Sequence, residues 1–192
     1  FMELKRVVVT GLGALTPIGN TLPDYWGALK SGVSGAARIT YFDPKHHKTQ
    51  FACELKGFDV NEFIHRKEAR RMDKFSQYAM VVTEEAINDA GLIEGSFNPD
   101  RVGVIWGSGI GGLETFQDEA QVLLKARESD TGPKFNPFFI PKMIADIAPG
   151  NISIKYGFRG PNYTTVSACA SSSHALIDAF TYLRLGKADV IV

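Results

Sequence analysis

Short apolar runs alternate with longer amphipathic segments along this chain, and the two patterns predict different elements. A run of apolar, often β-branched residues bounded by glycine, proline or charged residues is typical of a buried strand. Four such runs occur, at residues 6–10, 101–106, 163–167 and 188–192. Residues 51–56 instead alternate apolar and polar positions, which predicts a strand with one buried face, and we expect Cys53 to lie buried on that face.

Helical spacing of apolar residues predicts five helices between these strands. The longest is expected to begin after Asp73, whose side chain can cap it, and to end before Gly91. The other four are expected at residues 24–30, 113–125, 141–148 and 170–185. Because strands that alternate with helices are typical of layered α/β proteins, we expect a sheet covered by helices.

The composition narrows the class of protein. Hydrophobic residues make up 44% and charged residues 22% of the 192 positions, values that fit a globular protein rather than a disordered or membrane-embedded one. Lys plus Arg and Asp plus Glu both number 21, so no overall charge would attract nucleic acid or an anionic membrane. The first apolar run follows charged residues and is too short for a signal peptide, so we expect a cytoplasmic protein.

The chain has two cysteines, Cys53 and Cys169, and neither has the spacing of a metal site or a disulfide framework. Cys169 follows the strand predicted at 163–167 and precedes the helix predicted at 170–185, and every residue from 167 to 173 is small. A sharp turn between a strand and a helix requires such small neighbours. Backbone N–H groups at the start of a helix favour a thiolate and can hold an oxyanion, so the pattern indicates a nucleophile for acyl transfer.

Two alternatives remain for this segment. Cys169 would be a small buried residue if the turn were closed over it. His174 follows five positions later, about 7.5 Å along a helix and about 140° around it, so it diverges from Cys169 and is expected to pack or form a hydrogen bond rather than act as its base. The remaining histidines are expected on the surface, and no second catalytic group is visible; they are His46, His47 and His65.

Four ordered motifs resemble the β-ketoacyl-[acyl-carrier-protein] synthase family, most closely its synthase II group. The active-site motif is Gly-Pro-Asn-Tyr-Thr-Thr-Val-Ser-Ala-Cys-Ala-Ser-Ser at residues 160–172, and the others lie at 8–20, 106–112 and 137–141. The resemblance implies the thiolase-like layered fold (αβαβα), of which residues 1–192 would form the N-terminal ketosynthase domain, with a mixed sheet covered by helices. We expect the C-terminal half of that fold to be missing here.

The resemblance also implies a reaction and its site. An acyl group carried on the phosphopantetheine of an acyl carrier protein passes to Cys169, whose backbone N–H forms half of an oxyanion hole. A malonyl thioester then loses carbon dioxide and attacks, giving a 3-oxoacyl thioester, with no other cofactor. Ile110 would line the acyl tunnel, and Phe139 would reach the pocket of the partner subunit in a homodimer whose interface includes residues 162–165. The family's two histidines and its lysine fall in the missing half, so we expect this stretch alone to be inactive.

A local excess of positive charge occupies residues 65–74. Spacings of three and four residues would place its basic side chains on one helical face, which alone indicates an ordinary solvated surface. The resemblance instead implies a docking site for the acidic carrier protein. The segment contains Arg66 as well as the four basic residues with this spacing, which are Lys67, Arg70, Arg71 and Lys74.

Four further functions stay open at this point. Residues 107–112 fit the Gly-x-Gly-x-x-Gly pattern of a dinucleotide site, although no acid-bearing strand follows the helix after it. A polyketide ketosynthase would share all four motifs. A non-catalytic subunit that determines chain length would usually lack Cys169, and a cysteine hydrolase would need a base outside this sequence.

Overall fold

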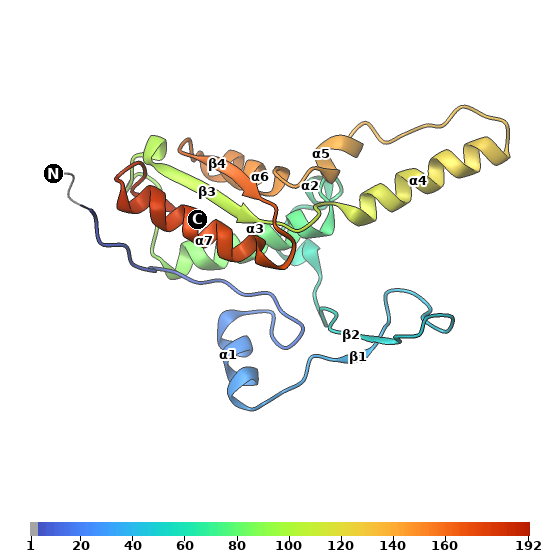
Figure 1. The fold of residues 1–192 in the computed structure, drawn as a ribbon, viewed down its shortest axis with the longest axis horizontal. Coiled ribbons are helices and arrows are strands. Elements are labelled where there is room, and N and C mark those ends of the chain that lie inside the picture. Colours follow the sequence, from blue (N-terminus) through green and yellow to red (C-terminus); the bar gives the residue numbers. More distant parts are fainter. Residues whose placement is uncertain (1–3) are drawn as a thin grey trace.

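The structure is a computed structural model that describes residues 4–192. Its centre is a three-stranded parallel sheet in the order β4-β3-β5 (Figure 1). The strands are β3 (Val102–Gly107), β4 (Asn162–Thr165) and β5 (Val190–Ile191). All three were predicted from the sequence, and the layered α/β class is confirmed.

Helices cover both faces of this sheet. Helix α7 (Ser171–Arg184) packs on one face of β3, whereas α6 (Ile147–Tyr156) packs on the other, with α3 (Lys74–Asp89) against α6. Val102 and Val104 point into the core that α3 and α6 form. Burial on both faces explains why the central strand is a continuous apolar run.

The ends of the longest helices follow local signals in the sequence. Asp73 caps α3 as predicted, since its side chain accepts a hydrogen bond from the Phe75 N–H (3.4 Å). Gly91 and Gly186 follow α3 and α7 in the left-handed conformation, with φ of +62° and +66°. Helix α4 (Leu113–Glu128) extends away from the sheet (Figure 1).

The helix predicted at 141–148 is wrong. The chain instead forms α5 (Phe139–Met143) and then α6, which runs through Pro149. Pro149 is the third residue of α6, and N–H groups in a first helical turn have no partner within the helix. The sequence pattern implied that a helix ends before Pro149, but a proline at this position does not end a helix.

Residues 6–10 do not form the predicted strand within the described part of the chain. They run as an extended segment beside α7, and Val9 is 78% exposed. An apolar run becomes a strand only when a neighbouring strand bonds to it, and residues 4–192 provide none here. The segment leads into α1 (Leu22–Lys30), which begins two residues earlier than predicted.

The prediction for Cys53 is also wrong. The strand predicted at 51–56 is reduced to β2 (Phe51–Ala52), which pairs antiparallel with β1 (Ala37–Arg38) in a two-stranded ribbon. This ribbon lies apart from the central sheet and its covering helices (Figure 1). Cys53 is consequently exposed.

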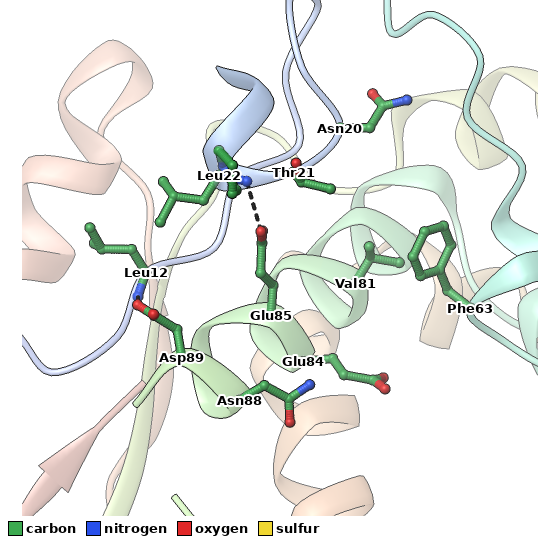
Figure 2. Close-up of a pocket in the computed structure, with 11 residues that line it drawn as sticks. Leu12, Asn20, Thr21, Leu22, Phe63, Val81, Glu84, Glu85, Asn88 and Asp89 are labelled. Carbon is green, nitrogen blue, oxygen red and sulfur yellow. Dashed lines mark hydrogen bonds between the residues drawn. The ribbon is translucent and has the colours of Figure 1, made fainter. Parts of the chain in front are cut away.

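Carboxyl groups on α3 hold the N-terminal segment in place. Glu85 accepts a hydrogen bond from the Leu22 N–H (2.7 Å), and Asp89 accepts one from the Leu12 N–H (2.9 Å) (Figure 2). Glu85 also accepts a hydrogen bond from the Ala14 N–H (2.7 Å). Glu85 and Asp89 line an open pocket of about 440 Å³. Both carboxyl groups already accept hydrogen bonds from the backbone, so their role in this pocket is to hold the N-terminal segment.

The remaining short elements are η1 (Val60–Glu62), α2 (Arg66–Ala69), η2 (Pro99–Arg101) and η3 (Ala168–Ala170). Between residues 4 and 192, no helix combines the length and apolarity that crossing a membrane requires. In the same range, no three His, Cys, Asp or Glu side chains gather in a way that could bind a metal ion.

Candidate active site

The turn that contains Cys169 lies beyond the carboxyl ends of two neighbouring strands. Thr165, the last residue of β4, lies opposite Gly107, the last residue of β3. After β4 the chain turns through η3 and enters α7 at Ser171. The predicted strand, turn and helix are therefore confirmed. Cys169 is exposed, so the alternative of a buried, closed-over cysteine is wrong. Sites for ligands often occupy this edge of an α/β sheet.

The turn is strained immediately before the cysteine. Ala168 has φ of +49°, and it is one of two residues other than glycine with positive φ in the described chain. The other, Asp130, lies in the exposed turn after α4. Alanine gains nothing from this conformation and must be held there by its surroundings.

Ser171 provides much of that support. Its hydroxyl accepts a hydrogen bond from the Ser167 N–H and donates one to the Ala168 carbonyl, both at 2.8 Å. Its own carbonyl accepts a hydrogen bond from the Thr165 hydroxyl (2.8 Å), which ties the start of α7 to the end of β4. The sequence reading counted Ser171 only as a small residue.

His174 is a hydrogen-bonding residue, as predicted. Its Nδ1 lies 2.7 Å from the Ser167 hydroxyl oxygen. The ring therefore supports the turn from the side of α7. The other three histidines are exposed, which confirms their predicted surface position; they are His46, His47 and His65.

The glycine-rich loop after β3 lies against the same turn. A side chain at Gly107 would come within 2.6 Å of the Ser172 Cα, so only glycine allows α7 to approach β3 this closely. A Cβ at Gly109 would lie 3.9 Å from the Ala168 carbonyl oxygen. Ile110, the predicted tunnel residue, follows in the same loop and is 70% exposed.

The far end of the loop is fixed by a buried carboxyl group. Asp73 is 6% exposed, and one of its oxygens accepts hydrogen bonds from both the N–H (2.9 Å) and the hydroxyl (2.6 Å) of Thr115, in the first turn of α4. A phosphate bound by a Gly-x-Gly-x-x-Gly loop would occupy the start of this helix. A carboxyl group already takes that place, which weighs against a dinucleotide site.

Phe139 is the first residue of α5 and stacks on Phe135, with 6.2 Å between the ring centroids. The segment is joined to the glycine-rich loop by a hydrogen bond from the Gly112 N–H to the Met143 carbonyl (2.8 Å). The loop that contains Ile110 and the helix that begins with Phe139 are thus parts of one packed region.

The basic residues do not share one helical face. Helix α2 ends at Ala69, and the chain turns before α3, so the predicted spacing does not apply across residues 66–74. Lys74 pairs with Glu114 (2.9 Å), and the Arg71 guanidinium lies 5.2 Å from the centre of the Phe138 ring. The three predicted carrier-binding residues are all exposed; they are Lys67, Arg70 and Arg71.

A family model described as "Beta-ketoacyl synthase, N-terminal domain" matches residues 4–192. The chain belongs to the β-ketoacyl synthase family. It is 47% identical over its whole length to the 3-oxoacyl-[acyl-carrier-protein] synthase 2 of Synechocystis sp. and covers 45% of that protein. Over 98% of its length it is 44% identical to the synthase 2 of Staphylococcus aureus, of which it covers 44%. The chain thus spans less than half the length of these relatives.

Solved ketosynthase structures share the fold. A β-ketoacyl synthase from Burkholderia phymatum matches with a TM-score of 0.80 and 30% identity over 96% of this chain and 45% of that one. The ishigamide ketosynthase/chain length factor matches with a TM-score of 0.87 and 25% identity over 98% of this chain and 46% of that one. A type II polyketide ketosynthase solved in complex with its acyl carrier protein matches with a TM-score of 0.80 and 26% identity over 97% of this chain and 49% of that one. These matches support the predicted thiolase-like fold.

Proposed function

We propose that this chain provides the acyl-accepting part of a 3-oxoacyl-[acyl-carrier-protein] synthase that acts in fatty-acid elongation. The observation that supports this most directly is the exposed Cys169 on a strained turn at the start of α7, beside the glycine-rich loop. The identity of 44–47% to two synthases 2 supports the choice of reaction within the family.

In the first step, the Cys169 thiolate attacks the carbonyl carbon of an acyl thioester on the carrier's phosphopantetheine. The resulting oxyanion accepts a hydrogen bond from the Cys169 N–H, and its collapse expels the carrier thiolate, which then takes up a proton. In the second step, a malonyl thioester loses carbon dioxide, and its carbanion attacks the acyl-cysteine. The Cys169 thiolate leaves, and the product is two carbons longer.

Decarboxylation requires groups that activate the malonyl thioester. We assign these, by the family resemblance, to the part of the relatives that this chain does not cover. His174 is engaged with Ser167, so it is not assigned a direct part in either step.

We further assign Ile110 to the acyl tunnel and Phe139 to the pocket of the partner subunit in a homodimer. Strand β4 supports the dimer, because it is an edge of the sheet and bonds only to β3 within the described residues. An unpaired edge can add a strand from a second copy. The cytoplasmic location also remains a prediction.

The exposed basic residues before α3 are assigned to carrier docking. The charge on Arg70 has no ion-pair partner within residues 4–192. Unpaired surface charge raises the rate of encounter with an oppositely charged partner and is screened by salt. The other two residues of this surface are Lys67 and Arg71.

The second cysteine supplies a matched control for the nucleophile. Both Cys53 and Cys169 are exposed, so exposure alone does not distinguish them. The full-length protein should form one acyl adduct with an acyl carrier substrate, and intact-mass measurement should show this adduct in Cys53→Ala but not in Cys169→Ala. An undiminished adduct in Cys169→Ala, or none in the wild type, would overturn the proposal.

A polyketide ketosynthase is the second candidate, and the likeness to a polyketide ketosynthase at 26% identity favours it. Fatty-acid elongation stays the first candidate, because the identity of the chain to the two synthases 2 is greater. Cys169 itself weighs against a non-catalytic partner subunit.

A further inference from the structure

Ala168 requires an explanation that its own side chain does not provide. A methyl group forms no hydrogen bond, yet φ of +49° places Ala168 in a region that residues other than glycine avoid. Strain of this kind persists only where neighbouring contacts impose it. Because Cys169 is the next residue, the contacts that impose it also decide where the sulfur and the Cys169 N–H lie.

One buried hydroxyl bonds on both sides of the strained residue. Ser171 is 3% exposed, and it joins the Ser167 N–H to the Ala168 carbonyl through two hydrogen bonds of 2.8 Å. Loss of the hydroxyl would leave the Ser167 N–H without this partner and the Ala168 carbonyl with the Ser171 N–H alone. Ala168 could then relax, and the peptide that it shares with Cys169 would rotate.

Two contacts with the strands hold the start of α7, and with it the Ser171 hydroxyl, in place. The Thr165 hydroxyl bonds to the Ser171 carbonyl, and Gly107 permits close contact of β3 with Ser172. The carboxyl ends of both strands therefore fix Ser171, and Ser171 fixes the turn.

We propose that Ser171 is a positioning residue for acyl transfer to Cys169. By holding the strained turn, it keeps the Cys169 N–H directed to the place where the oxyanion develops while the sulfur attacks. This inference rests on the proposed function. It assigns to Ser171 an effect on the transition state of acyl transfer rather than on substrate binding.

The test compares two reactions of the same sulfur in the full-length protein. Acyl transfer from a thioester generates an oxyanion, whereas alkylation by iodoacetamide does not. Ser171→Ala should slow acyl-enzyme formation by about 100-fold, comparable to losing one oxyanion-hole donor. The KM for the acyl donor and the rate of Cys169 alkylation should both stay near their wild-type values, because alkylation develops no oxyanion.

Thr181→Ala is the matched control. Thr181 also lies on α7 and donates a hydroxyl hydrogen bond of 2.8 Å to the Ile177 carbonyl, far along the helix from the turn. Its loss should leave both reactions unchanged. Ser171→Thr keeps the hydroxyl and should retain most of the acylation rate.

Should Ser171→Ala fail to fold, the same pair of rates is measured for Ala168→Gly with and without Ser171→Ala, because glycine adopts positive φ without strain. Wild-type acylation by the folded Ser171→Ala protein, or equal losses in acylation and alkylation, would overturn the positioning role alone. A wild-type protein that forms no acyl-enzyme would instead overturn the proposed function together with this inference.

Discussion

Replacing Asp73 with alanine removes a carboxyl group on which two helix starts depend. Asp73 accepts hydrogen bonds from the N–H of Phe75 in α3 and from the N–H and hydroxyl of Thr115 in α4. The two helices are joined at this point although Asp73 and Thr115 are 42 positions apart in the sequence. The glycine-rich loop ends beside them at Gly112.

The expected loss can be assembled from these contacts. Leaving the buried Thr115 N–H without an acceptor costs about 1–3 kcal/mol. Losing the side-chain cap of α3 costs about 1 kcal/mol more. Asp73→Ala should therefore reduce the free energy of unfolding by about 3 kcal/mol, since both effects arise at a site that is only 6% exposed.

Urea-induced unfolding of the full-length protein measures this loss, and Asp59→Ala is the control. Asp59 also caps a helix, η1, by accepting the Asn61 N–H (2.9 Å), but it is exposed and serves one helix start only. Its replacement should cost distinctly less. A loss for Asp73→Ala that is no larger than for Asp59→Ala would refute the reasoning that one buried carboxyl group joins α3 to α4.

Two further results are expected. Glutamate substitutions at Lys67, Arg70 and Arg71 should raise the KM for a carrier-bound substrate far more than for a small thioester, whereas Lys48→Glu, on the exposed loop between β1 and β2, should change neither. Equal effects on both substrates would mean an ordinary solvated surface. The Arg101 guanidinium lowers the pKa of Asp189 from 3.8 to about 2, so the ion pair stabilises the fold above pH 3.8 and is lost as the pH falls towards 2. The stability difference between wild type and Asp189→Asn should shrink over that interval, and a constant difference would contradict it.

Much of the central fold could be predicted because its signals are local. The apolar run of β3 and the Asp73 cap of α3 are visible within a few residues, and both are confirmed. The small residues around Cys169 likewise predicted the turn between β4 and α7. Steric limits on a sharp turn act between neighbours in the chain, so the sequence reveals them.

The failures share a different cause. Residues 6–10 have the composition of a strand, but residues 4–192 provide no strand that bonds to them, and nothing in that range buries Cys53. Helix α2 ends at Ala69, and this end separates basic residues whose spacing predicted a shared helical face. In each case the outcome depends on what lies beside the segment, which periodicity does not encode.

The sequence by itself determined the family, the elements of the central sheet and the cysteine at the start of α7. Only the tertiary structure decided that Ser171 holds a strained Ala168 and that Asp73 joins two helices. The physical reason is that propensity and spacing act over a few residues, whereas a buried hydrogen-bonding group is satisfied by whichever partner folding brings to it.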